Sequence, residues 1–126
     1  MKIILLVDDD PLQASFMLSV LGQNFGDVRR VTDASEALCL IEQPDFAGRL
    51  GLVISAHHTL RIGGPAFVSE VRARKPNLPV LVLGAIGETA AEYAETDTIF
   101  LATPFASERM LTLTRQILAD HEKAAA

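Results

Sequence analysis

Acidic side chains are missing from the middle of this 126-residue chain, which has 16 aspartates and glutamates in all. None occurs between Asp45 and Glu70, although this stretch contains the strand-like run 50–55. Acidic residues are instead clustered directly after the first apolar run, at Asp8, Asp9 and Asp10. Carboxylates this close repel one another, so such a cluster usually holds a cation, caps a helix, or does both. The sequence therefore predicts a charged site that lacks an acidic partner from the central run.

Cysteine and long apolar runs are also scarce. The single cysteine, Cys39, excludes an internal disulfide and a cysteine zinc site, and we expect it to be a small buried side chain. No apolar run reaches about 18 residues, which argues against a membrane-spanning helix. The first apolar run is short and ends in acid, so it does not resemble a signal peptide. These absences predict a soluble, cytoplasmic protein.

Positive charge is sparse as well. Lysine and arginine total 11 and the formal net charge is -5, which argues against a nucleic-acid surface. The one basic cluster lies at a predicted helix end, where cations favour the helix dipole: Arg72, Arg74 and Lys75. Neither GxGxxG nor GxxxxGK[ST] occurs, and three aspartates would repel a phosphate, so a nucleotide-binding enzyme is disfavoured too.

Five short runs have the character of β-strands. They are residues 3–7, 27–31, 50–55, 79–83 and 98–101. The first, third and fourth are continuously apolar, as expected for parallel strands that are covered on both faces.

Amphipathic segments separate these runs. Asp10 can cap the first helix with Pro11 at its first position, and Asp33 with Glu36 resembles a capping box at the second. The last helix is expected over about 107–120, and a weaker fourth helix over 88–95. The side chains predicted to face the sheet are Phe16, Met17, Val20 and Leu21, then Ala37, Leu38 and Ile41, then Phe67, Val68 and Val71, and finally Met110, Leu113 and Ile117.

This alternation predicts a doubly wound α/β fold, (βα)5, with a five-stranded parallel sheet. We expect one domain over residues 1–121 and a disordered tail over 122–126. Ligands of such sheets bind beyond the carboxyl ends of the strands. In this chain that edge would gather residues 8–10, 55–58, 84–85 and 102–104.

Five motifs follow one another in an informative order. They are Leu5-Leu6-Val7-Asp8-Asp9-Asp10-Pro11, Glu36-Ala37-Leu38, Gly64 with Phe67, Pro79-Val80-Leu81-Val82, and Thr103-Pro104-Phe105. Together they cover nearly the whole chain, which resembles the receiver (CheY-like) domain of bacterial two-component response regulators. The resemblance implies a flavodoxin-like fold with strand order 2-1-3-4-5.

In that family an acidic pair after the first strand helps to hold Mg²⁺, and Asp8 and Asp9 match it. An aspartate at the end of the third strand accepts a phosphoryl group from a histidine kinase. Counting back from Gly64 places this acceptor at Ala56, and counting along the strand places it at Ser55; neither residue is acidic. The resemblance therefore implies a degenerate receiver without its phosphoacceptor.

Other members of the family's active set are also lost. The Ser or Thr position after strand four falls on Gly84, the lysine position after strand five falls on Thr103, and the switch aromatic of strand five is Phe100. The only lysines of the chain are Lys2, Lys75 and Lys123. Phosphoryl transfer needs a nucleophile and groups that neutralise charge on the phosphoryl oxygens, and alanine has no nucleophilic atom.

These features predict an atypical receiver, a pseudo-receiver, that acts in two-component or phosphorelay signalling as a phosphorylation-independent protein-interaction module and not as an enzyme. We expect a histidine kinase or a downstream regulator as partner, docking on a face that includes strand five and the last helix. No nucleic acid, membrane or required cofactor is expected. A homodimer through the last two helices and strand five is a further hypothesis.

The alternative is a metal- or small-ligand-sensing pocket at the same edge. Asp8 and Asp9, with the backbone carbonyl of His58, would form the family's Mg²⁺ site minus one anionic ligand, which predicts weak binding of Mg²⁺ or another divalent cation. In the competing interpretation Asp10 caps a helix and the other two acids are solvated. His57 and His58 are either loop residues or ligands for zinc or nickel.

Overall fold

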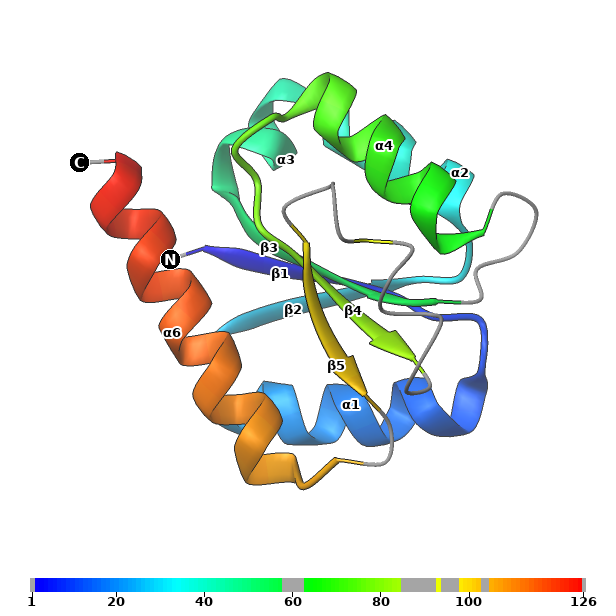
Figure 1. Ribbon diagram of the computed structural model, residues 1–126, viewed down its shortest axis with the longest axis vertical. Helices are drawn as coiled ribbons and strands as arrows, with labels where there is room; N and C mark the ends of the chain where they lie inside the picture. Colours follow the sequence, from blue (N-terminus) through cyan, green and yellow to red (C-terminus); the bar gives the residue numbers. More distant parts are fainter. Residues whose placement is uncertain (1, 58–62, 85–92, 94–97, 103–104, 126) are drawn as a thin grey trace.

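The computed structural model describes residues 2–57, 63–84, 93, 98–102 and 105–125 (Figure 1). Strands and helices alternate along the chain. The strands are β1 (Ile3–Val7), β2 (Asp27–Val31), β3 (Leu50–Ala56), β4 (Val80–Gly84) and β5 (Ile99–Ala102). The helices are α1 (Pro11–Asn24), α2 (Ala34–Ile41), α3 (Pro44–Arg49), α4 (Gly64–Arg74) and α6 (Ser107–Ala125).

The strands form one parallel sheet in the order β2-β1-β3-β4-β5, with β3 at its centre. The predicted fold class and strand order are confirmed. Each predicted strand boundary lies within one residue of the observed boundary. The long apolar runs located the strands well because a parallel sheet that is covered on both faces needs no polar positions.

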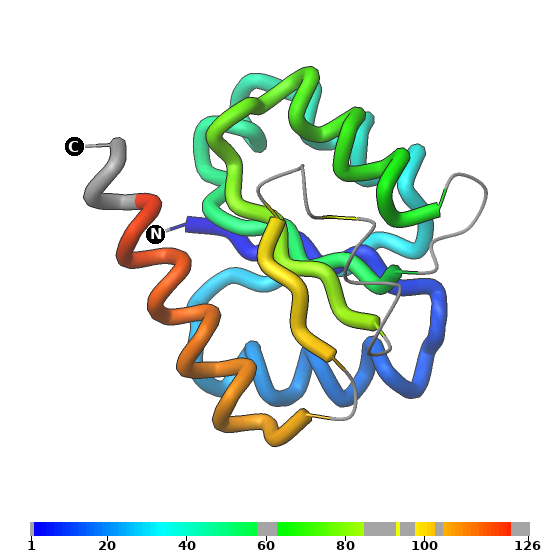
Figure 2. The backbone as a smooth tube through the Cα atoms, in the orientation of Figure 1, coloured from blue at the N-terminus to red at the C-terminus, as the bar shows by residue number. Residues whose placement is uncertain are grey.

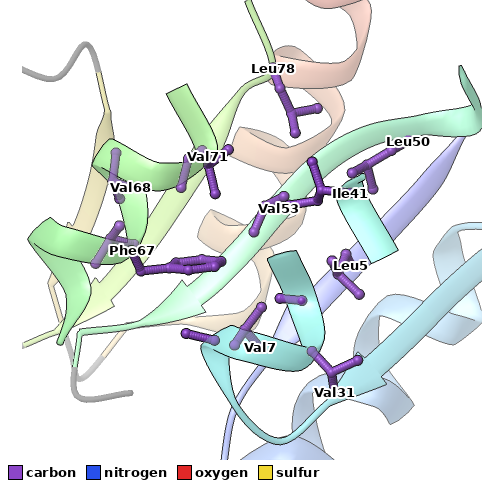
Figure 3. Close-up of a cluster of buried hydrophobic side chains, with 14 of the residues drawn as sticks. Leu5, Val7, Val31, Ile41, Leu50, Val53, Phe67, Val68, Val71 and Leu78 are labelled. Carbon is purple, nitrogen blue, oxygen red and sulfur yellow. The ribbon is translucent and has the colours of Figure 1, made fainter. Parts of the chain in front are cut away.

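Helices cover both faces of the sheet, with α1 and α6 on one side and α2, α3 and α4 on the other (Figures 1 and 2). Side chains of a strand alternate between the two faces. In β1, Ile4 and Leu6 pack in the cluster under α1 and α6, whereas Leu5 and Val7 pack in the opposite cluster. Figure 3 shows that second cluster, in which Phe67 lies near the sheet residue Val53. Burying one such side chain contributes about 1.5–3 kcal/mol to the free energy of folding. The two clusters together therefore hold the sheet, and with it the strand ends, in place.

The helix starts follow the sequence signals. Oδ1 of Asp10 accepts hydrogen bonds from the backbone N–H groups of Leu12 and Gln13, at 3.0 and 3.4 Å. Oδ1 of Asp33 accepts from the backbone N–H of Glu36 at 2.8 Å. Both predicted caps are confirmed, and each satisfies donors that a helix leaves free in its first turn.

Two predicted core positions are wrong. Phe16 is 50% exposed, and the buried stripe of α1 consists of Ala14, Met17 and Leu21 instead. Cys39 is exposed because Ala37 and Ile41 occupy the face of α2 that packs on the sheet. In both helices the angular position around the axis decides burial, and the residue type does not.

The helix bounds differ from the prediction in two places. α3 was not expected; it is a six-residue helix anchored by buried Phe46. α6 continues to Ala125, into the tail for which the sequence predicted disorder, because no glycine or proline ends it there. The predicted helix 88–95 falls outside the described residues except for Tyr93. None of the described helices has the length and apolarity needed to cross a membrane.

Candidate functional site

The carboxyl ends of β1, β3, β4 and β5 meet at one edge of the sheet, as the sequence predicted. Val7 pairs with Ser55, Ala56 with Leu83, and Gly84 with Ala102. This register places Asp8, Ala56, His57 and Gly84 along the same edge. His58 and Thr103, which the sequence also assigned to this edge, lie outside the described residues.

Asp8 is the buried member of the acidic cluster. Its side chain is 2% exposed, and Oδ1 accepts a hydrogen bond of 2.9 Å from the backbone N–H of Asp10. Two hydrogen bonds hold the backbone of Asp8. The N–H of Asp8 donates to the Val31 carbonyl, and Nε of Arg30 donates to the Asp8 carbonyl, each at 3.1 Å. Within the described part of the chain, Oδ2 of Asp8 is buried and has no hydrogen-bond partner.

Burial therefore dominates the electrostatics of Asp8. Desolvation raises the pKa of this carboxyl above its usual 3.8, and the charges of Asp10 and Asp9 raise it further. The hydrogen bond from the Asp10 backbone N–H and the charge of Arg30 act in the opposite direction and only reduce the rise. Repulsion among the acids, which the sequence suggested, is real but is the smaller cause.

The other two acids have different positions. Asp9 and Asp10 are both exposed, and Asp10 is the helix cap described above. In the described ranges, no group of three or more His, Cys, Asp or Glu side chains comes together in a way that could hold a metal ion. The site of Asp8, Asp9 and the His58 carbonyl stays a prediction, because His58 is not described.

The end of β3 carries no carboxylate. Ala56 is half-buried at the last position of the strand. Ser55, the other position to which the acceptor could be aligned, is fully buried, and its hydroxyl donates to the Ala56 carbonyl at 3.0 Å. Neither side chain offers a carboxylate to a ligand at this edge.

Aromatic side chains gather beside Ala56. Nδ1 of His57 and the Tyr93 hydroxyl are 2.7 Å apart and share a hydrogen bond, and the two rings meet edge to face with centroids 5.7 Å apart. Tyr93 is 2% exposed and stacks on Phe100, with centroids 6.0 Å apart and an interplanar angle of 29°. The backbone N–H of His57 also donates to the Leu83 carbonyl at 2.8 Å. This group of His57, Tyr93 and Phe100 is called the aromatic cluster below.

Two glycines make room for the aromatic cluster. A Cβ atom at Gly64 would overlap the Tyr93 hydroxyl and would lie 2.7 Å from the His57 carbonyl oxygen. A Cβ atom at Gly84 would lie 3.0 Å from Cβ of His57 and 3.2 Å from two ring atoms of Phe100. Gly84 is the residue that the resemblance aligns with the family's Ser or Thr position, and the space beside it is filled by His57 and Phe100.

Sequence reasoning missed the aromatic cluster. His57 was treated as a loop residue or metal ligand, and its described side-chain partner is Tyr93. Tyr93 is the only tyrosine of the chain, which was the one available signal, but it lies 36 positions beyond His57. Nothing in local spacing indicates that these two residues meet.

A sizeable cavity lies at the opposite edge of the sheet, away from the acids. Its volume is about 490 Å³. It is lined by residues near the amino ends of β4 and β5 and the carboxyl ends of α4 and α6, among them Arg72, Leu78, Val80, Ile99, Ile117 and His121. Because ligands of doubly wound sheets bind at the carboxyl ends of the strands, we place the candidate site at the Asp8 edge.

Comparisons with known proteins agree with the fold. No protein-family model matches the chain, and a search of curated proteins finds no match. Solved structures do match. The signal receiver domain of an HD domain-containing protein from Pseudomonas fluorescens Pf-5 has a TM-score of 0.86 at 24% identity, over 98% of this chain and 91% of that one.

Two further structures give the same result. The receiver domain of NtrX from Brucella abortus has a TM-score of 0.82 at 26% identity, over 92% of this chain and 98% of that one. The chemotaxis protein CheY4 of Vibrio cholerae has a TM-score of 0.80 at 24% identity, over 93% of this chain and 98% of that one. The chain therefore has the fold of receiver domains of response regulators.

The burial of Asp8 gives a pH-dependent prediction. Because the pKa of Asp8 is higher in the folded state, ionised Asp8 opposes folding at neutral pH, and this penalty disappears as the pH falls through the folded pKa towards 3.8. Asp8→Asn keeps the acceptor for the Asp10 N–H and carries no charge. We expect urea unfolding to show Asp8→Asn more stable than the native protein at neutral pH, with the difference shrinking in acid.

The matched control for this substitution is Asp9→Asn, at an exposed position where the free energy of unfolding should change by less than about 0.5 kcal/mol at either pH. A loss of stability in Asp8→Asn at neutral pH would contradict the assignment of Asp8 as a desolvated, destabilising charge.

The packing at Gly64 gives a second prediction. In Gly64→Ala the new methyl group must displace the Tyr93 hydroxyl or the His57 carbonyl, and overpacking of this kind costs about 1–3 kcal/mol. Gly22→Ala is the matched control, since nothing lies within 4 Å of its Cβ and a helical Gly→Ala change stabilises by about 0.5–1 kcal/mol. Chemical denaturation measures both. Equal stability of the two variants would show that the aromatic cluster does not press on Gly64.

Proposed function

We propose that this chain is a pseudo-receiver: a signalling domain with the receiver fold that acts through protein interaction and without phosphorylation of an aspartate. The observation that carries the proposal is the methyl side chain of Ala56 at the end of β3, where an acceptor would stand. The aromatic cluster next to it supports the same conclusion, because it packs the neighbouring positions Gly64 and Gly84.

Chemistry supports the proposal independently of alignment. An acyl phosphate requires a carboxylate nucleophile, and the transferred group needs cations around its oxygens. Lys2 and Lys75 both line a pocket at the amino-terminal edge of the sheet, remote from Ala56, and the third lysine, Lys123, is near the end of α6. No lysine among the residues described at the Asp8 edge could replace the missing cation.

The fold supports a proposal for the kind of partner. Receiver domains are signalling modules, and the proposed partner is a histidine kinase or a downstream regulator in the cytoplasm. The proposed docking face includes β5, which carries Phe100 of the aromatic cluster, and α6, the next helix along the chain. With no nucleophile at Ala56, binding would be controlled by the concentration of the partner or by another ligand, and no catalytic activity is proposed.

A second candidate function rests on Asp8. A buried carboxylate oxygen without a partner is costly, and a cation beside it would relieve that cost. Asp8, exposed Asp9 and a backbone carbonyl are a poor donor set for a hard cation, since the third carboxylate of the family site is absent. If Mg²⁺, Mn²⁺ or Zn²⁺ raised the melting temperature of the native protein but not of Asp8→Asn, this metal-sensing function would be favoured.

The proposal is tested by incubation with acetyl phosphate and Mg²⁺ followed by intact-mass spectrometry. We expect no gain of a phosphoryl group, because Ala56 has no nucleophilic atom and the Ser55 hydroxyl is buried and donates to the Ala56 carbonyl. A receiver domain that retains its acceptor aspartate, treated in parallel, shows that the reagent is active. A stoichiometric phosphoryl adduct on this chain, lost on treatment with hydroxylamine as an acyl phosphate is, would refute the proposed function.

A further inference from the structure

Helix α1 has an unusual outer face. Its 14 residues include no aspartate, glutamate, lysine, arginine or histidine, although a surface helix normally carries charge on its solvent side. Large apolar side chains stand there instead, with Leu12 83% exposed and Phe16 50% exposed. In the part of the chain that the structure describes, the only other large hydrophobic side chain of this kind is Ile99 on β5.

The exposed side chains of α1 form one continuous stripe. Leu12, Phe16, Ser19 and Gln23 recur at helical spacing and lie opposite the buried stripe that packs on the sheet. The small exposed residue Ser15 lies beside this stripe, so another helix could approach closely. The face is about 21 Å long, from 14 residues at 1.5 Å each. We call it the α1 face.

The two ends of the α1 face carry opposite charge. Asp9 and Asp10 are exposed at its amino-terminal end. At the other end Arg115 of α6 donates to Oδ1 of Asn24 at 3.0 Å and lies over the Phe25 ring, 5.9 Å from its centroid. Figure 1 shows α6 passing beside the carboxyl-terminal part of α1. The order along α1 is therefore acidic, then uncharged and apolar, then basic, with the basic Arg115 on the flank of the α1 face next to α6.

We propose that the α1 face binds a second copy of this chain, with the two α1 helices antiparallel. A two-fold axis through the middle of the face brings the acidic end of each copy to the basic end of the other, and the apolar side chains of both copies meet between them. The antiparallel arrangement also opposes the two helix dipoles favourably. A symmetric dimer requires a surface whose charges and apolar side chains match the same surface of the second copy after a two-fold rotation.

The size of the face sets the strength of the dimer. Stable interfaces bury about 800 Å² on each partner, and one helix face of this length supplies less than that. We therefore expect a weak dimer that forms and dissociates with concentration. The inference does not rest on the proposed function, because neither Ala56 nor a phosphoryl group takes part in this contact.

Sedimentation velocity over a wide concentration range tests the proposal. We expect the weight-average mass of the native protein to rise with concentration, and high salt to weaken the association. Phe16→Asp should raise the dissociation constant at least about tenfold by placing like charges at the centre of the contact. Ile99→Asp is the matched control at the other exposed apolar position and should leave the dissociation constant unchanged. Circular dichroism confirms that each variant is folded.

A charge exchange makes the test specific for the antiparallel geometry. Asp9→Arg and Arg115→Asp should each be monomeric alone, because each variant pairs like charges at both ends. A mixture of the two variants should dimerise, since both ends of the mixed dimer then pair opposite charges. Arg109→Asp, also an exposed arginine of α6, is the control for Arg115→Asp and should dimerise like the native protein.

Several outcomes would overturn the proposal. One is a native protein that stays monomeric at all concentrations. Binding of a different protein to the α1 face of such a monomer would also count against the dimer. Another is a dimer that Ile99→Asp dissociates and Phe16→Asp does not, which would place the contact at β5. The third is a mixture of Asp9→Arg and Arg115→Asp that remains monomeric.

Discussion

The hydrogen bond between Nδ1 of His57 and the Tyr93 hydroxyl connects the end of β3 to a residue 36 positions further along the chain. It forms in a space that exists only because Gly64 and Gly84 have no side chains. Phe100 completes the packing by stacking on Tyr93, which ties the edge of the sheet to β5. Side-chain packing in this way holds the carboxyl edge of the sheet together beside Ala56 and Gly84.

The acids at the same edge of the sheet have two different roles. Asp8 is buried with a raised pKa and an oxygen that has no described partner, whereas Asp10 has a structural role at the start of α1. Desolvation without a compensating partner is unfavourable, so Asp8 is a charge that the fold tolerates and does not use for stability.

The sequence predicted the sheet well because buried parallel strands are long apolar runs, and it predicted the caps because Asp10 and Asp33 act on neighbouring backbone groups. The predicted burial of Phe16 and Cys39 was wrong, because the position of a residue around the helix axis, and not its type, decides whether it faces the sheet. At the site, residue identities alone show that neither Ser55 nor Ala56 carries a carboxylate. The contact between His57 and Tyr93 could not, because it depends on how distant segments meet in three dimensions.

We propose that the edge of the sheet beside Ala56 neither accepts a phosphoryl group nor changes its conformation in response to one. The most direct measurement is an NMR titration of isotope-labelled protein with beryllofluoride, a phosphoryl mimic that binds receiver carboxylates, in the presence of Mg²⁺. We expect the amide resonances of Ala56, Gly84 and Phe100 to match those recorded with Mg²⁺ alone. New resonances for these three residues in slow exchange would contradict it.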